Sequence, residues 1–347
     1  MSHEIEPFDK VVSTTGKEWH ELATHVPSID FSNSGLNFRV DEVPLAYASG
    51  LRSAPVSGWI GLKATRYVLS PGLFGGYSRH DTNETTYLGV VKDTYRIIQN
   101  REIWDTIQKG LEDARKGAWE IVTSGSIMGG KRVFVSIKLE ESEWSLSKED
   151  KYKTYLSFTS GHDGALALEA GLSNTRIVCS NTFHYHLQGK TDIASRVQHR
   201  GDTKQKIIDM VKSIKCFVET RNLLEQNLQT MRTNLIVEDT ARLFTLGFLS
   251  KKEQWGNTEE TAEKVLELFK GGRGNEGKNR YDLFNGFTEY YTHNGSDRTR
   301  SQRFVSSEFG WRSQQKELLF NILLNDRRFS EYQAFGSEWL KNKAPNN

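Results

Sequence analysis

Alternation of hydrophobic and polar residues is clearest in the middle of the chain, where it predicts three strands. Residues 132–139 (RVFVSIKL) alternate with the two-residue period of a strand. The run before them, residues 119–128, is joined to them by Gly129-Gly130, a dipeptide typical of tight hairpin turns. Residues 151–160 (KYKTYLSFTS) form a third run rich in β-forming residues. The pattern therefore predicts an antiparallel three-strand meander.

Helical periodicity lies on both sides of the meander. Asn100 is placed to cap a helix that ends near Gly117, and a strand is predicted before it over Tyr87–Gln99. After the third strand, a helix is predicted over Ala165–Gly171. Apolar residues at spacings of three and four then predict helices over residues 203–249, 258–270, 281–291 and 314–325.

These patterns predict an α+β fold, with a central antiparallel three-strand meander flanked by helices and a helical C-terminal region. The expected organisation is an acidic N-terminal arm over residues 1–45, an α+β core over 46–235 and a helical region over 236–347. No apolar run approaches the ~20 residues of a membrane span, and the first residues lack a secretory pattern. We expect a protein of the cytoplasm with no membrane partner.

The formal net charge of +2 on 347 residues hides an uneven distribution. Residues 1–50 hold three basic and eight acidic residues, a net charge of −5, so the remaining 297 residues carry +7. Basic residues are concentrated in residues 190–215 and again in 271–316, where they alternate with Tyr and Phe. Cations and flat rings together are what a nucleic-acid surface needs. The other interpretation is a solvated basic face beside an ordinary aromatic core.

Four residues are weak candidates for a metal site. His162 and Asp163 lie in a GHDG motif, but sequence neighbours point in different directions, so a strand-to-helix turn with Asp163 as cap is favoured. His184 and His186 would share one face of a strand, a spacing that zinc ligands use. No carboxylate cluster accompanies them. The sequence therefore predicts no catalytic residue, no metal and no cofactor, and a non-enzymatic protein is favoured.

The number of cysteines and the spacing of the glycines exclude a cysteine-based framework and a phosphate loop. Two cysteines cannot build a disulfide framework or a four-thiolate zinc site. The string SGSIMGGKR, residues 124–132, is one residue short of a phosphate loop and joins two strands, whereas a phosphate loop opens a helix. Its Lys131-Arg132 pair is still a candidate phosphate contact.

Several motifs in series resemble one family. They are YLGVVKDTYRIIQN, GSIMGGKRVFVSIKL, YLSFTSGHDGALAL and TRIVCSNT, followed by His199 and, more weakly, by NRYDLFNGFTEYYTH. The series resembles the phage- and plasmid-borne proteins of the domain-of-unknown-function family DUF932, and it implies a mobile-element origin. One departure is Val197-Gln198 before His199, where the family has isoleucine and arginine. The order of helix, meander and helix is also similar to RecT- and Red-beta-like single-strand annealing proteins, which implies DNA binding on a homo-oligomer without metal or nucleotide.

The leading hypothesis is a non-enzymatic phage or plasmid protein that binds DNA, single-stranded DNA above all, in recombination or replication. Its phosphate contacts would be Lys131, Arg132, Arg176, Arg196, Arg200 and Lys204. One alternative is a protein–protein module that inhibits a host factor, with the acidic arm as a DNA mimic. Another is a metal-dependent nuclease that uses His162, Asp163, His184 and His186. The sequence leaves the choice among DNA, RNA and protein partners open.

Overall fold

A computed structural model gives the fold, and it divides the chain into two compact units. Unit 1 comprises residues 1–141, 155–172 and 186–218, and unit 2 comprises residues 142–154, 173–185 and 219–347. The structure describes residues 10–14, 23–42, 46–49, 52–55, 65–66, 77–81, 84–89, 91–92, 95–115, 119–148, 150–176, 181–186, 196–211, 216–251, 258–293, 306–307 and 310–343.

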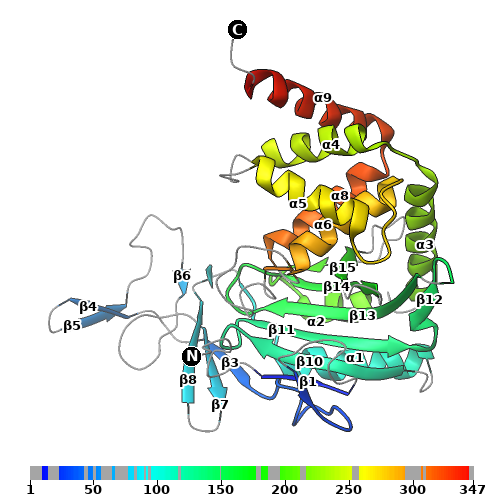
Figure 1. Cartoon of the computed structure of the whole chain (residues 1–347). Helices are drawn as coiled ribbons and strands as arrows, with labels where there is room; N and C mark the ends of the chain where they lie inside the picture. Colours follow the sequence, from blue (N-terminus) through cyan, green and yellow to red (C-terminus); the bar gives the residue numbers. More distant parts are fainter. Residues whose placement is uncertain are drawn as a thin grey trace. The chain divides into compact units, whose positions relative to one another are not determined.

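The strands precede most of the helices along the chain (Figure 1). Their bounds are β1 Lys10–Ser13, β2 Thr24–His25, β3 Arg39–Glu42, β4 Ala46–Ser49, β5 Arg52–Pro55, β6 Thr65–Arg66, β7 Tyr77–Asp81, β8 Glu84–Gly89, β9 Val91–Lys92, β10 Trp119–Ile127, β11 Arg132–Leu139, β12 Glu143–Ser145, β13 Lys151–Gly161, β14 Leu168–Arg176, β15 Asn181–His186 and β16 Arg196–Val197. A short 3-10 turn covers Glu140–Ser142.

The main sheet contains the predicted meander at its centre. Its strand order is β15-β14-β13-β11-β10-β1-β2, with β12 paired to β13 and β16 to β14. The pairs β10–β11 and β11–β13 are antiparallel, and the register places Arg132 opposite Gly161. Helices cover the sheet and follow it along the chain, so the predicted α+β fold with a helical C-terminal region is confirmed.

The turn between β10 and β11 explains the glycine pair in the sequence. Met128, Gly129 and Gly130 have φ angles of 55°, 67° and 95°, so three successive residues are left-handed. Glycine adopts that conformation at no steric cost. The Gly130 N–H donates to the Ile127 carbonyl and the Lys131 N–H donates to the Met128 carbonyl. The hairpin prediction is therefore confirmed.

Three local predictions are wrong. The helix expected over Ala165–Gly171 is absent, because residues 168–176 form β14, which pairs with β16. Pairing to neighbouring strands outweighs the helix propensity of this alanine- and leucine-containing run. The strand expected over Tyr87–Gln99 stops early, and no strand covers residues 95–99 in the described part of the chain. Asn100 is the first residue of a helix, but its side chain does not cap that helix, because it binds Leu36, Phe38 and His162 instead.

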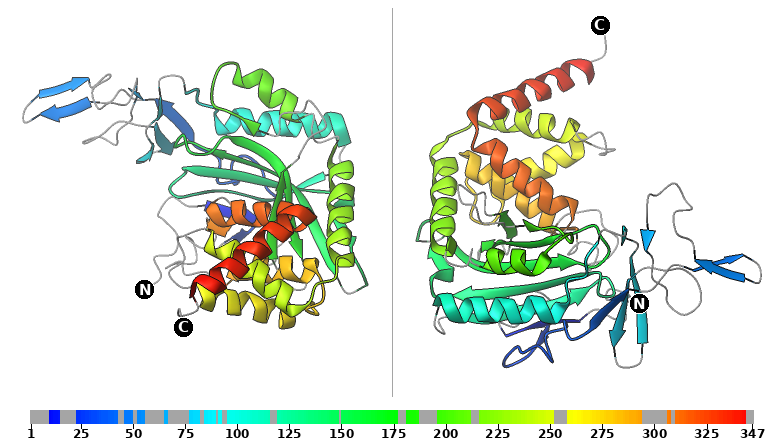
Figure 2. Two further views of the ribbon diagram at one scale, coloured as in Figure 1. Left: turned by 90° about the horizontal axis from the view of Figure 1, so that it is seen from above. Right: turned by 180° about the vertical axis from the view of Figure 1, so that it is seen from behind.

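Unit 1 has its helices α1 (Asn100–Arg115) and α2 (Thr203–Val211) side by side against the sheet (Figure 2). Ile103, Trp104, Ile107 and Leu111 lie at helical spacing on α1 and are all at most 2% exposed. They form one apolar face buried against the sheet, as expected for an amphipathic helix. Smaller sheets, β3-β7-β8, β4-β5 and β6-β9, complete the strands of this unit.

Unit 2 is mainly helical, with α3 Phe217–Thr233, α4 Glu238–Ser250, α5 Thr258–Gly271, α6 Arg280–His293, α8 Trp311–Leu323 and α9 Asp326–Lys343. The first residues of α3 still belong to unit 1. Sequence periodicity predicted most of these helices but did not separate α3 from α4 and missed α9. Helix α9 lies along α4 (Figure 1). No helix in the described part of the chain is long and apolar enough to cross a membrane.

Candidate nucleic-acid interface

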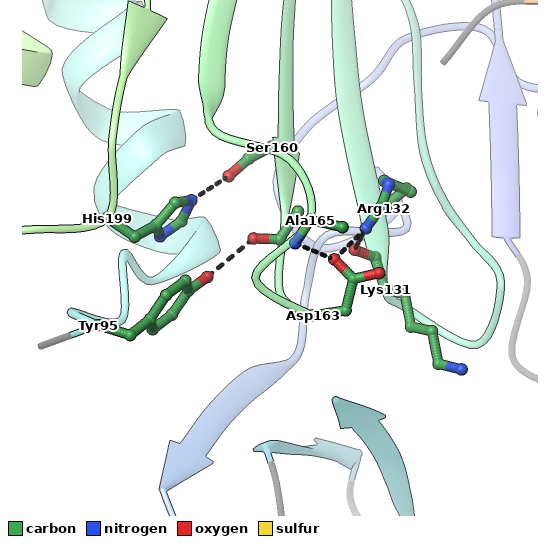
Figure 3. Close-up of polar contacts among 8 residues, drawn as sticks. Tyr95, Lys131, Arg132, Ser160, Asp163, Ala165 and His199 are labelled. Carbon is green, nitrogen blue, oxygen red and sulfur yellow. Dashed lines mark hydrogen bonds and ion pairs between the residues drawn. The ribbon is translucent and has the colours of Figure 1, made fainter. Parts of the chain in front are cut away.

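Strand β13 ends at Gly161, and several polar side chains from distant segments meet there (Figure 3). The Tyr95 hydroxyl donates to the Gly161 carbonyl at 2.9 Å. The next residue, His162, donates its backbone N–H to the Lys131 carbonyl at 2.9 Å. Strand pairing therefore holds the hairpin end, the GHDG turn and the segment before α1 at one end of the sheet in unit 1. We call this group the Gly161 corner.

His199 is fixed in the Gly161 corner by its neighbours on both sides. Its Nδ1 lies 3.1 Å from the Arg96 carbonyl, which only accepts, so Nδ1 carries the proton. Nε2 is then an acceptor and receives the Ser160 hydroxyl at 3.5 Å. The Tyr95 ring stacks on the imidazole, with centroids 4.6 Å apart and planes 6° apart. Burial lowers the pKa of His199 to about 4, although the Arg96 carbonyl opposes this shift.

His162 is held by Asn100, the residue expected to cap α1. The Asn100 amide nitrogen donates to the carbonyls of Leu36 and Phe38, so its oxygen faces the imidazole and accepts from Nε2 at 2.7 Å. The side chain that looked like a cap thus bridges two other parts of unit 1. Burial, with smaller contributions from His199 and Arg132, lowers the pKa of His162 to about 3. Its Nδ1 has no hydrogen-bond partner among the described residues.

Asp163 forms an ion pair with Arg132 across the turn. Arg132 Nη1 lies 2.5 Å from Asp163 Oδ1, and the Ala165 N–H donates to the same oxygen at 2.9 Å. The predicted capping role is therefore partly right, because Asp163 does bind a backbone N–H two residues on. The turn connects β13 to β14, however, and no helix follows it.

The chemistry of this corner is that of neutral, buried imidazoles. Ser160 and His199 have the contacts of a nucleophile and its base, but Ser160 is 1% exposed and the contact is long. Among the described residues, no group of three His, Cys, Asp or Glu side chains is arranged to hold a metal ion. Of the weak metal candidates, His162 and Asp163 bind Asn100 and Arg132, respectively. The side chains of His184 and His186, on β15, lie outside the described ones.

Exposed cations gather beside the corner. The Arg96 N–H donates to the His199 carbonyl at 2.8 Å, so the exposed side chains of Arg96 and Arg200 extend from two paired segments. Lys206, also exposed, donates from Nζ to the Arg200 carbonyl at 3.0 Å. Asp202 lies between them in sequence and accepts from the Gln205 N–H. We call Arg96, Arg200 and Lys206 the basic cluster.

The residues predicted to contact phosphate differ in their surroundings. Arg200 is exposed, Lys131 is half-buried, and Arg132 is paired with Asp163. Arg196 is exposed but lies 3.0 Å from Glu169 on β14. Residues Arg176 and Lys204 lie in β14 and α2, and their side chains are outside the described ones.

The aromatic residues of the C-terminal region are core residues wherever the structure describes them within α6. Tyr281, Phe284, Phe287, Tyr290 and Tyr291 are all at most 7% exposed. Two arginines of this region are also used internally. Arg280 pairs with Asp326 at 2.7 Å and covers the Phe329 ring at 4.0 Å, while Arg312 is 2% exposed and donates to the Tyr291 carbonyl. For these residues the interpretation as an aromatic core is right.

Sequence reasoning missed Tyr95, Arg96 and Lys206 as members of one surface. No periodicity marks them, because the contacts of Tyr95 and Arg96 with His199 join segments about 100 positions apart. The one signal available was the basic run of residues 190–215, which contains Lys206 and Arg200. Tyr95 and Arg96 lie inside the recognised motif YLGVVKDTYRIIQN.

Comparison with known proteins gives one result. A family model described as "Domain of unknown function (DUF932)" matches residues 87–315, which is more than half of the chain. No curated protein and no solved structure matches. The likeness to single-strand annealing proteins therefore has no support from these comparisons.

Proposed function

The chain belongs to the DUF932 family, a domain of unknown function, and from that premise we propose that it is a non-enzymatic protein that binds single-stranded DNA. We further propose that it acts in recombination or replication of a phage or plasmid, as a homo-oligomer in the cytoplasm of the host cell. The family assigns no activity, so the argument depends on the surface of unit 1.

The basic cluster carries the proposal. Arg96, Arg200 and Lys206 are exposed and come from two segments that a backbone hydrogen bond holds together. A cationic surface held by the backbone binds phosphates without sequence preference and releases counterions when it does so. None of the three side chains takes part in an ion pair among the described residues. Their charge is therefore available to a polyanion.

An aromatic side chain beside the cluster supports a single strand rather than a duplex. Tyr95 is half-buried and precedes Arg96 directly, and its ring lies flat on His199. Proteins that bind single strands combine a basic groove with rings on which bases stack, because only unpaired bases expose their faces. A duplex buries those faces.

The test is fluorescence anisotropy with the full chain and a labelled oligothymidine of about 30 nucleotides, a length that spans one or more typical binding sites. Affinity is measured over a salt series, and we expect it to fall steeply. The triple variant R96A/R200A/K206A should lose affinity. The slope of log K against log salt should also become shallower by about 2, since each single-strand phosphate contact contributes about 0.7 to it.

A matched control removes the same charge elsewhere. Lys109, Lys264 and Arg327 are exposed on α1, α5 and α9, and their substitution by alanine also removes three positive charges. The control should keep the wild-type salt slope. Binding that is indifferent to salt, or equal losses in both triple variants, would contradict the proposal. Capture of one stoichiometric host protein by the nuclease-treated chain, without DNA binding, would favour the protein–protein module instead.

A further inference from the structure

Arg132 lies across the end of β13 because Gly161 has no side chain. A Cβ atom added at Gly161 would lie 2.9 Å from Arg132 Nη1 and 2.8 Å from the Leu166 Cβ. The guanidinium thus occupies a space next to the backbone of the GHDG turn. There it meets Asp163 on the same turn. The side chains of Arg132 and Asp163 are 13% and 18% exposed, respectively. The pair is shielded but not closed off from solvent.

The ion pair uses only part of the guanidinium. Arg132 Nη1 donates to Asp163 Oδ1 and to the Lys131 carbonyl, at 2.5 and 3.1 Å. No hydrogen bond joins Nη2 or Nε to any residue that the structure describes. An arginine fork paired with a carboxylate or phosphate often makes two parallel bonds, which are the stronger arrangement. Asp163 supplies one oxygen to Arg132 and leaves the other donors of the fork available.

Asp163 is carried by a short surface turn. Gly164 and Ala165 are exposed, and Gly164 has a φ of 79°, a conformation that glycine adopts without strain. The carboxylate is bound at Oδ1 by two donors, the Arg132 guanidinium and the Ala165 N–H. A nucleic-acid phosphate is an anion with several acceptor oxygens, so it can satisfy the same donors and also the unused part of the fork.

We propose that Arg132 and the Ala165 N–H form a phosphate-binding subsite that Asp163 occupies in the free protein, and that a DNA phosphate displaces this carboxylate. Arg132 then adds one contact to those of the basic cluster, and Asp163 weakens binding by competing for it. This inference rests on the proposed DNA-binding function. It identifies Asp163 as an internal competitor and gives Arg132 two alternative partners.

The substitution D163N tests the inference, because asparagine keeps an oxygen for the Ala165 N–H and loses the negative charge. We expect D163N to bind the labelled oligothymidine about fivefold more tightly at about 50 mM salt, with a salt slope steeper by about 0.7, as one added phosphate contact predicts. The gain should disappear in the double variant R132A/D163N. The control D113N removes an exposed carboxylate of α1, and it should change the affinity and the salt slope by less than D163N does.

The outcomes separate this inference from the proposed function. If the wild type binds DNA and D163N binds no better, or if the gain persists without Arg132, the subsite is refuted and the basic cluster stands. If neither the wild type nor D163N binds, both are refuted. If D163N binds DNA and the wild type does not, this would support the idea that Asp163 blocks the phosphate subsite completely in the free protein. Circular dichroism checks the fold of each variant, and D163S, whose hydroxyl can also accept from Ala165, replaces D163N if that variant unfolds.

Discussion

Asn100 and His162 are joined by a buried hydrogen bond of 2.7 Å that connects the start of α1 to the end of β13. The Asn100 amide also donates to the carbonyls of Leu36 and Phe38, so one side chain serves three segments of unit 1. Gln99, beside it, pairs with both backbone groups of Val40, at 3.1 and 2.7 Å. Two consecutive amides thus bind backbone groups of residues 36–40, in addition to the pairing of Arg39 and Val40 with β7.

The substitution N100A should destabilise unit 1 strongly. It removes three hydrogen bonds at a fully buried position and leaves the His162 Nε2–H without its acceptor, while the Leu36 carbonyl keeps only the Phe38 N–H. We expect a loss of about 2–4 kcal/mol in the free energy of unfolding, measured by urea denaturation. N37A, at an exposed position of the neighbouring segment, is the control and should change the free energy by less than ~0.5 kcal/mol. Similar losses in both variants would contradict the bridging role.

The two buried histidines should make the protein less stable as the pH falls below 6.5. Their pKa values in the folded chain are lowered to about 3 for His162 and about 4 for His199. The unfolded chain therefore takes up these protons near pH 6.5 while the folded chain does not, so stability is greatest above that pH. Each histidine should contribute a slope of up to ~1.4 kcal/mol per pH unit from there down to its folded pKa.

Urea denaturation between about pH 7 and 5 measures this slope before most carboxylates titrate. The variants H162Q and H199Q should each be less stable at neutral pH and should each show a smaller dependence on pH. A wild-type stability that stays constant over this interval would mean that the histidines are accessible to protons in the folded chain.

Arg196 and Arg200 should contribute unequally to DNA binding, although they are four residues apart. Arg196 already pairs with Glu169 at 3.0 Å, whereas Arg200 has no carboxylate partner among the described residues. We expect R200A to weaken binding on the order of fivefold at about 50 mM salt, as loss of one phosphate contact predicts. R196A should weaken it by less than about twofold. Affinity is measured by anisotropy on the same oligothymidine. A larger loss of affinity in R196A than in R200A would exclude Arg200 as the stronger phosphate contact of the two.

Local sequence signals were sufficient to predict the meander and insufficient to predict β14, the strand that follows it. The hairpin between β10 and β11 follows from Gly129-Gly130 and the alternation on either side, which are properties of neighbouring residues. The run ALALEAG, residues 165–171, is rich in helix-forming residues, and only pairing within the sheet makes its last four residues, 168–171, part of β14. Its partners are the neighbouring strands β13 and β15 and the later strand β16, which the composition of the run itself does not reveal.

The same limit applies to the Gly161 corner. The sequence marked His162, Asp163, Arg132 and Arg200 as chemically interesting, but not their partners. Asn100 was interpreted as a helix cap because caps and long-range amide bridges use the same residue type. Which interpretation holds depends on residues 36–38, about 60 positions away. Contacts of that range are set by the folded sheet and leave no local pattern.

The contact between α4 and α9 in unit 2 depends on two glycines. A Cβ atom added at Gly247 would lie 1.8 Å from the Tyr332 carbonyl oxygen, and one added at Gly336 would lie 1.9 Å from the Leu243 carbonyl oxygen. Both obstacles are backbone atoms, which no rotamer change can move. G247A or G336A should therefore push the helices apart and lower the free energy of unfolding by about 2–3 kcal/mol or more.

Gly271, at the end of α5, is the matched control for this prediction. A Cβ atom there would meet no atom within 4 Å, so G271A should change the free energy of unfolding by less than ~1 kcal/mol in either direction. Urea denaturation followed by circular dichroism compares the three variants, since most helices of the chain lie in unit 2. The separation of α4 from α9 also exposes the Phe244–Phe329 stack, whose centroids are 4.7 Å apart. Binding of a hydrophobic dye should therefore rise in G247A and G336A and stay at the wild-type level in G271A. Equal stability in all three variants would show that α9 can shift without loss of packing.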